Sequence, residues 1–449
     1  MGISGSFKTI AFVTTALGLV LASALEVQAG GFAIREQSAV GQGSSFAGAG
    51  TPGMGLSGMF WNPAAINSAR GWESESHISA VLPHSEVTAL PGTSPGLLAL
   101  GSDAGNVGRS GLIPASYGAY RLNPNLVVGY SMNAPFGLST RTIVPWAGQQ
   151  LGTNGQVKSI DFAPIVGYQV NDWLSIGAGP RVMWLQGKFT RALSPLAAVP
   201  ALSALEVDDI GFGFTAGLTL TPWGPGTEIS LGYRSQVDLT LEGDIQFPLF
   251  APLGAVSGAR LGIGNGDITT PDQVTLGIRH RVSPQFTLLG TVEWANWSKV
   301  QQVTFTGVPA PLPAPGVTFN YRDGWFFAAG GEYQLNRQYT LRAGVAFERS
   351  PVTDAVRDPI LPDNDRWWFS AGVTANLLSW VTMDFGYSFI WVGDTPINVV
   401  AGHPDFAQIA AASVGGPGLL ANADPYIHIF AASLRFKWTA EPARVITKG

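Results

Sequence analysis

The chain has 449 residues, a formal net charge of −5 and no cysteine. Charged residues make up only 12% of it, against roughly 25% in typical soluble domains. This composition argues against a soluble protein and fits a chain that faces lipid. The absence of cysteine excludes disulfides, thiol catalysis and thiolate metal sites, and without a Lys/Arg cluster no nucleic-acid partner is expected.

The first 29 residues have the layout of an export signal. Lys8 supplies a short basic region, residues 10–25 are apolar, and VQA at 27–29 places small residues before the expected cleavage point. An uncleaved anchor helix needs about 20 apolar residues, and Glu26 interrupts this run. We therefore expect residues 1–29 to be a cleaved signal peptide.

No later apolar run reaches the length of a membrane-spanning helix, roughly 18 residues or more. Because backbone groups in lipid must all be paired internally, an exported apolar chain without such helices is expected to be a closed β-barrel. The segment VTMDFGYSF at 381–389 alternates apolar and polar residues, as a barrel strand does, and 340–348 and 430–438 repeat the pattern.

The same pattern predicts fourteen antiparallel strands in an all-β transmembrane barrel. The expected strands are 72–87, 112–122, 125–137, 157–170, 173–191, 205–222, 227–247, 268–282, 286–305, 318–335, 339–349, 365–378, 380–393 and 424–438. Short connections alternate with long ones; the long ones are 88–111, 138–156, 192–204, 248–267, 306–317, 350–364 and 394–423. This alternation is typical of short periplasmic turns and long external loops.

Residues 30–71 precede the first strand and are rich in Gly, Ala and Ser. A barrel of about fourteen strands is wider than its own side chains can fill, so its lumen needs a plug. We expect residues 30–71 to be an N-terminal hatch inside a barrel of residues 72–438, with a tail at 439–449. The alternative is a flexible periplasmic tail.

A family resemblance appears at NPAAI (62–66). With the start GGF (30–32), FAPIVGYQVNDWLSIGAG (162–179), GFGFTAGLTLTPWGPGTEISLGYRSQVDLTLEGD (211–244) and LPDNDRWWFSAG (361–372), it resembles the outer-membrane long-chain fatty acid transporter (FadL) family. The resemblance covers nearly the whole chain after residue 29. It implies a hatch-plugged barrel that carries hydrophobic molecules inward without ATP, with hatch residues Phe32, Ile34, Asn62, Pro63 and Ala64. The chain departs from the family in the tail after Trp438 and in its loops.

Two segments are candidates for substrate passage. Apolar loops usually mark binding surfaces, so the loop residues Phe247, Leu249, Phe250 and Leu253 are expected to capture hydrophobic substrate, unless the loops only pack on one another as a cap. In the third strand, Pro135 lacks a backbone donor and Gly137 relaxes the chain, so Pro135, Phe136 and Gly137 predict a break in the wall. In the resembling family a kink here is the lateral exit; an ordinary strand end is the alternative.

Four arginines fall on the polar, inward phase of their strands and are candidate contacts for a carboxylate: Arg181, Arg234, Arg279 and Arg342. The alternative is that each is paired with a lumen Asp or Glu.

The acidic residues Asp354, Asp358, Asp363 and Asp365 lack the Gly and distal Glu of a calcium loop and predict a solvated acidic loop. The five histidines have no metal-ligand spacing, so no metal and no cofactor are expected.

The function predicted is passive transport of hydrophobic compounds across the outer membrane by a chain that is not an enzyme. Long-chain fatty acids are the expected substrate, with aromatic hydrocarbons as the alternative. The protein is expected to be a monomer embedded in outer-membrane lipid. A barrel hydrolase would need a positioned nucleophile, and the sequence contains no G-x-S-x-G elbow. A polar porin would have polar loops and no plug.

Overall fold

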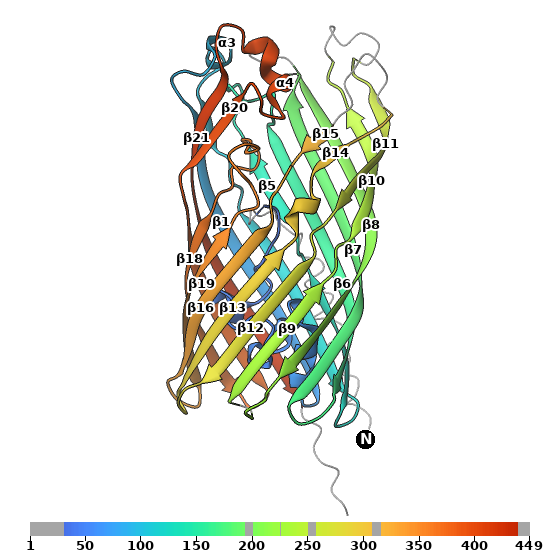
Figure 1. Cartoon of the computed structure of the whole chain (residues 1–449), viewed down its shortest axis with the longest axis vertical. Coiled ribbons are helices and arrows are strands. Elements are labelled where there is room, and N and C mark those ends of the chain that lie inside the picture. Colours follow the sequence, from blue (N-terminus) through green and yellow to red (C-terminus); the bar gives the residue numbers. More distant parts are fainter. Residues whose placement is uncertain (1–30, 194–200, 225, 250–256, 308–315, 439–449) are drawn as a thin grey trace, which may run out of the picture.

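The computed structural model describes residues 31–193, 201–224, 226–249, 257–307 and 316–438. One antiparallel sheet of 19 strand segments closes into a barrel around an interior segment (Figure 1). Five segments are continuations or external additions (β2, β5, β10, β11 and β20), which leaves fourteen strands around the wall. The predicted fourteen-stranded barrel with an N-terminal hatch is confirmed. The predicted signal peptide and the tail lie outside the described residues.

The strands of the wall follow one another around the barrel in chain order. They are β1 (Trp72–Ala89), β3 (Gly111–Arg121), β4 (Leu126–Asn133), β6 (Asn154–Gln169), β7 (Leu174–Ala192), β8 (Leu202–Leu220), β9 (Thr227–Arg234), β12 (Gln273–Arg281), β13 (Phe286–Ala295), β16 (Gly324–Gln334), β17 (Tyr339–Arg349), β18 (Arg366–Leu378), β19 (Val381–Val392) and β21 (Gly418–Trp438). The first and last strands close the barrel, with paired residues from Trp72–Trp438 to Ala89–Ala421.

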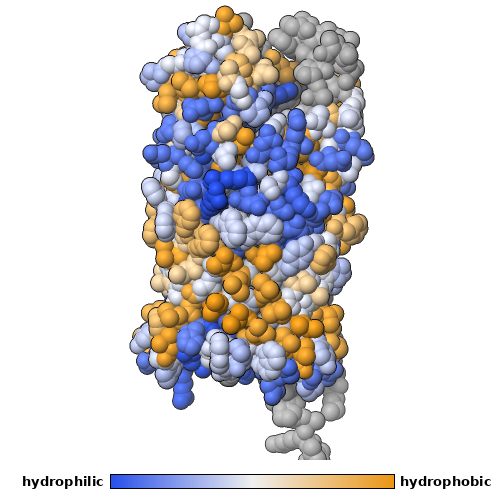
Figure 2. Space-filling model, in the orientation of Figure 1, coloured by the Kyte–Doolittle hydropathy of each residue, from blue (hydrophilic) through white to orange (hydrophobic). Residues whose placement is uncertain are grey.

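The apolar and polar residues that alternate in the sequence face opposite sides of the wall. In β6, Ile160 and Phe162 are exposed to the outside, whereas Asp161 and Ala163 between them are buried on the inside. Figure 2 shows apolar side chains gathered over the lower wall and hydrophilic ones above. This arrangement places a lipid-facing belt near the end that carries the short turns.

Short elements occupy the interior and the end with the long loops. The interior ones are α2 (Ala39–Gln42), η1 (Pro52–Met54), η2 (Leu56–Phe60) and η3 (Pro63–Ser68). Those toward the long loops are α3 (Pro95–Leu98), β2 (Asp103–Asn106), β5 (Gly137–Arg141), β10 (Asp238–Gln246), β11 (Arg260–Thr269), η5 (Trp297–Lys299), β14 (Gln302–Thr304), β15 (Gly316–Thr318), β20 (Thr395–Val400), α4 (Phe406–Ile409) and η6 (Ala410–Ala412). None of the described helices is long and apolar enough to span a membrane.

Three strands expected to be continuous are interrupted. The third strand of the wall divides into β4 and β5, the segment 227–247 into β9 and β10, and the next strand into β11 and β12. The expected loop 248–267 is too long, because β11 already begins at Arg260. Glycines at every second position of 262–266 hide the alternation there, since glycine has no side chain to mark a face.

Candidate functional site: hatch, wall break and lumen cavity

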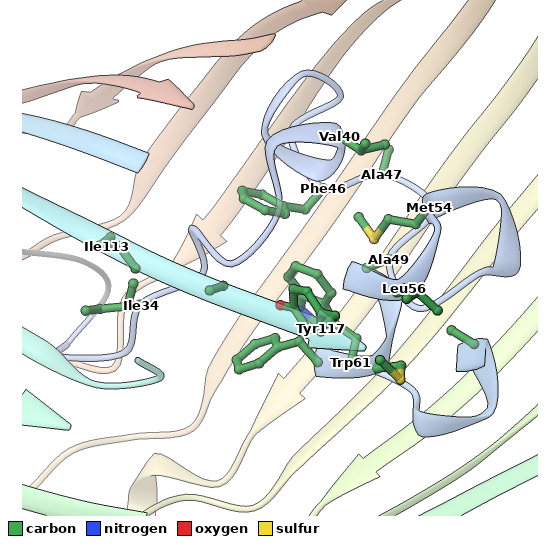
Figure 3. Close-up of a cluster of buried hydrophobic side chains, with 14 of the residues drawn as sticks. Ile34, Val40, Phe46, Ala47, Ala49, Met54, Leu56, Trp61, Ile113 and Tyr117 are labelled. Carbon is green, nitrogen blue, oxygen red and sulfur yellow. The ribbon is translucent and has the colours of Figure 1, made fainter. Parts of the chain in front are cut away.

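The hatch fills the part of the lumen nearer the short turns with a hydrophobic cluster. Phe46 and Trp61 of the hatch lie with ring centroids 5.5 Å apart, and Phe46 also meets Trp368 of β18 edge-on at 5.9 Å. Tyr117 of β3 belongs to the same cluster (Figure 3). Its hydroxyl donates to the Gln37 carbonyl of the hatch at 2.9 Å. The small residues of the hatch are thus buried against the inner face of the wall.

Wall glycines let the hatch backbone approach closely. A Cβ added to Gly232 would lie 1.8 Å from the Trp61 carbonyl oxygen, and one added to Gly277 would lie 1.9 Å from the Ala49 carbonyl oxygen. Any larger residue at either position would force backbone atoms apart. This explains why the segment and the facing strands are both rich in small residues.

Asn62, Pro63 and Ala64 join the hatch to the wall. The Asn62 side chain accepts the Ala64 N–H at 3.0 Å and so caps η3, which begins at Pro63. Its Nδ2 donates to the carbonyls of Gly50 at 3.1 Å and Leu218 of β8 at 3.0 Å. One buried amide therefore connects two turns of the hatch to the barrel.

Arg181 and Arg234 share one buried carboxylate. Arg181 Nη2 lies 2.7 Å from Asp161 Oδ2, and Arg234 Nη2 lies 3.1 Å from Asp161 Oδ1. Arg234 also donates to the Phe60 carbonyl at 3.1 Å, and its guanidinium lies 4.3 Å from the centroid of the Phe60 ring. Arg234 thus holds the hatch to the wall, while Arg181 bonds only to wall residues, Asp161 and the Ser235 carbonyl.

Arg279 and Arg342 form a second ion-pair group around Glu332. Arg342 Nε lies 2.7 Å from Glu332 Oε1, and Arg279 pairs with the other oxygen of Glu332. Arg279 also lies 3.9 Å from Glu228, whose carboxylate accepts the N–H of Gly53 in the hatch at 2.9 Å. All four predicted arginines are thus paired with carboxylates; their contact with a substrate carboxylate stays a prediction.

The wall is broken beside Pro135. The ladder between β3 and β4 ends at the pair Ser116–Met132. Toward the long loops, the chain just before β3 pairs with β5, because the Arg109 N–H donates to the Ser139 carbonyl at 3.3 Å. Between these points residues 133–138 do not pair with β3, whereas Asn133, Gly137 and Leu138 still pair with β6. Pro135, which cannot donate to a ladder, lies in the middle of this break.

The start of the hatch covers this break. The N–H of Ile34 donates to the Pro135 carbonyl at 2.7 Å, and the N–H of Gly137 donates to the Phe32 carbonyl at 2.8 Å. Phe136 is held separately, since its N–H donates to Ser159 Oγ at 2.8 Å. Residues 32–34, which we call the latch, therefore act as a short strand that pairs with the displaced wall segment.

An apolar cavity of about 130 Å³ lies between the latch and the long loops. Phe32 and Leu138 line its end beside the break, and Phe189, Phe305 and Phe319 add aromatic surface. Phe32 also packs edge-on against Trp297, with ring centroids 4.8 Å apart. The cavity thus reaches the point where the latch covers the wall.

Polar groups of the cavity include Arg191, Asp358, Asp405 and Gln408. Arg191 Nη1 donates to Gln408 Oε1 at 2.9 Å, and Gln408 Nε2 donates to Asp405 Oδ1 at 2.8 Å. Burial and, secondly, the nearby charge of Asp405 raise the pKa of Asp358 to about 6. Burial likewise raises the pKa of Asp405 above its ordinary value.

The expectation of a solvated acidic loop is wrong for part of that loop. Asp363 is only 4% exposed, pairs with Arg366 and accepts the Gly31 N–H at 3.0 Å, while Asp358 faces the cavity. This burial could not be predicted from the sequence, because it arises only when the loop folds inward onto the hatch. Within the described residues, no group of three or more His, Asp or Glu is arranged to hold a metal ion.

The loop residues expected to capture substrate differ in their surroundings. Phe247 is buried, at 5% exposure, within the cluster around the cavity, whereas Leu249 is 90% exposed. Phe250 and Leu253 lie outside the described residues. Of the described pair, only Leu249 offers apolar surface to the outside.

Sequence reasoning missed the ion pair that fixes the latch. Arg35 Nη2 lies 2.9 Å from Glu293 of β13 and 3.8 Å from Glu348 of β17. The available signal was Arg35, which with Glu36 forms the only charged pair of residues 30–50, together with an inward-phase glutamate in each of two strands, Glu293 and Glu348. The path of the hatch decides which glutamates it meets.

Comparisons with known proteins agree with this architecture. Residues 20–438 match the model of the family described as "Outer membrane protein transport protein (OMPP1/FadL/TodX)". The chain is 27% identical over 412 residues to a 47 kDa outer membrane protein of Pasteurella multocida, covering 85% of this chain and 92% of the relative. It is 24% identical over 423 residues to a long-chain fatty acid transport protein of Salmonella typhi, covering 88% and 94%.

Solved structures show the same fold. A Pseudomonas aeruginosa FadL homologue superposes with a TM-score of 0.76 at 21% identity, covering 91% of this chain and all of the homologue (100%). The Ralstonia pickettii toluene transporter TbuX superposes with a TM-score of 0.62 at 17% identity, covering 90% and 99%. The protein is therefore an outer-membrane β-barrel that transports hydrophobic compounds rather than an enzyme. The chain belongs to the OMPP1/FadL/TodX family of outer membrane transport proteins.

Proposed function

We propose that this protein carries long-chain fatty acids passively, from apolar external loops through the lumen cavity and sideways into the membrane. The observation that supports this route is the continuity between the cavity and the wall break. Phe32 belongs to both, since its side chain lines the cavity and its carbonyl accepts the Gly137 N–H. A hydrophobic substrate at Phe32 lies against the one segment that covers the break.

The lateral route follows from the cost of wetting the substrate. A hydrophobic molecule gains about 25 cal/mol for each Å² of apolar surface kept from water. An aqueous axial exit would forfeit that gain, whereas a side exit leads from an apolar cavity to lipid. Release of the latch from Pro135 would leave the segment 133–138 with no partner strand on that side, and the break would open.

A disulfide between the latch and the wall tests the route. Ala33 and Phe136 form an antiparallel bridge, a pairing whose usual Cα separation of about 4.5–5.5 Å suits a disulfide. The A33C/F136C variant should lose uptake of a labelled long-chain fatty acid when oxidised and regain it on reduction. The pair Y120C/V128C, in the continuous β3–β4 ladder, is the matched control and should transport in both states. Full uptake by the oxidised latch variant contradicts lateral exit.

The volume of the cavity favours aromatic hydrocarbons as a second candidate substrate. A closed apolar cavity of about 150 Å³ is large enough for benzene, and this one measures about 130 Å³. A single ring fits it as it stands, whereas a long acyl chain needs more volume than this cavity offers. Mass spectrometry of compounds that co-purify with the protein, and competition between toluene and palmitate for uptake, separate the two.

A further inference from the structure

The polar end of the cavity carries more negative than positive charge. Asp358 and Asp405 both line it, and they lie close enough for the charge of one to affect the ionisation of the other. Arg191 is the second-last residue of β7, at the end toward the long loops. Its guanidinium is already hydrogen-bonded to Gln408. Asp405 is the carboxylate whose charge acts on this guanidinium.

The other ionisable groups near Asp358 do not offset this charge. His403 accepts the Asp405 N–H at Nδ1, at 3.1 Å, and burial lowers its pKa, so it is neutral at physiological pH. Tyr321 stays protonated, because burial raises its pKa well above the ordinary value. In the same loop, Arg357 pairs with Asp354, and Asp363 pairs with Arg366.

We propose that the cavity takes its substrate with an uncharged head group, a protonated carboxylic acid or an alcohol, and that Asp358 and Asp405 exclude anionic head groups. This inference rests on the proposed function and names the form in which that substrate is carried. An ionised acid would bring a third carboxylate to one guanidinium in an apolar enclosure, where like charges repel one another strongly. A hydroxyl or a protonated acid can instead donate a hydrogen bond to a carboxylate oxygen.

Binding of three eight-carbon probes to the purified protein tests the proposal: octane, octan-1-ol and octane-1-sulfonate, which is an anion at every working pH. Each is measured by displacement of the fluorescent dye N-phenyl-1-naphthylamine in a non-ionic detergent. At pH 8 the D358N/D405N variant should bind the sulfonate roughly tenfold or more tightly than the unaltered protein does. Its affinity for octan-1-ol should change little.

The variant is conservative at both positions. An asparagine at 358 keeps an oxygen for the N–H groups of Ile360 and Leu361, and one at 405 keeps the acceptor for Gln408. The matched control is D354N, in the same loop but with a largely exposed carboxylate. It should leave the affinity for all three probes unchanged.

The outcomes separate this inference from the proposed function. An unchanged sulfonate affinity in D358N/D405N, or an equal gain in D354N, overturns the exclusion of anions. Failure of octane and octan-1-ol to displace the dye would instead count against a hydrophobic binding cavity, and so against the proposed function. Lowering the pH from 8 to 5 should raise the sulfonate affinity of the unaltered protein and not that of D358N/D405N.

Discussion

The guanidinium of Arg35 in the hatch lies 2.9 Å from the carboxylate of Glu293 in β13. Both side chains are nearly buried, at 12% and 6% exposure, and Arg35 also stacks 3.7 Å from the ring centroid of Phe326. Glu293 accepts a further hydrogen bond from Thr275 Oγ1 at 2.9 Å. The pair attaches the chain directly after the latch to the side of the barrel opposite the break that the latch covers.

Replacement of Arg35 by Met should loosen the hatch. The change leaves Glu293 buried without its cation, and breaking a buried pair in this way costs about 3 to 5 kcal/mol. We expect R35M to show higher ion conductance in planar bilayers. The control R260Q breaks an exposed pair with Asp244 and should conduct like the unaltered protein. If the double variant R35M/E293Q recovers low ion conductance, the effect of R35M is due to the unpaired charge of Glu293. Wild-type conductance in R35M would show that the Arg35–Glu293 pair does not hold the hatch in place.

A methyl group on a wall glycine should displace the hatch where its backbone touches the barrel. G232A and G277A place a Cβ within 2 Å of hatch carbonyl oxygens, at 1.8 and 1.9 Å, so the two backbones must separate. G290A in β13 is the matched control, because its Cβ would have no neighbour nearer than 3.9 Å. Proteolysis of the hatch from the periplasmic side should accelerate in the first two variants only. Equal protection in all three would mean that the hatch adjusts freely.

The two described loop residues should respond differently to serine. L249S removes apolar surface that is exposed, so uptake should fall at low substrate concentration while the melting temperature stays the same. F247S removes a buried ring and should destabilise the loops by about 3 kcal/mol or more. Normal uptake by L249S at every concentration would remove this residue from substrate capture.

The pKa of Asp358 predicts a local effect of pH on the outer loops. Its folded pKa of about 6 is above the ordinary value of 3.8, so the folded loop binds the proton more tightly than the unfolded one. The loop should therefore be more stable at pH 4 than at pH 7, losing stability as the pH rises through about 6. Hydrogen exchange at the Ile360 and Leu361 amides, compared with D358N, measures this. The pH dependence should be smaller in the variant, where the raised pKa of Asp405 still contributes.

The wall could be predicted from the sequence because lipid and lumen impose opposite polarity on successive residues. The strand expected at 380–393 is β19, Val381–Val392, where large apolar residues alternate with small or polar ones from Val381 to Phe389. The start of β11 was missed because Gly262, Gly264 and Gly266 leave one face without side chains. The break at Ser235–Val237 was missed because no glycine or proline marks it.

The site was less predictable, because it depends on how the interior segment crosses the lumen. Pro135 and Gly137 marked the break through their own backbone chemistry, which needs no partner. By contrast, Asp358 reads as a surface residue until its loop turns inward over the cavity. Whether a lumen arginine is paired likewise depends on strand register, which places Asp161 beside both Arg181 and Arg234.

The hydrogen bonds of the hatch reach both the first strand of the wall and the last ones: Leu56 bonds to Glu75 of β1, 19 residues away, whereas other partners are far apart in the chain. Gln42 donates to Ser388, 346 residues away, and Ser45 donates to Ser370, 325 residues away. The hatch leaves the ribosome before the wall strands, yet its partners on β18 and β19 are among the last to be made. The contacts with β18 and β19 can only form once these late strands are in place. Complete docking of the hatch therefore belongs to the last steps of barrel assembly.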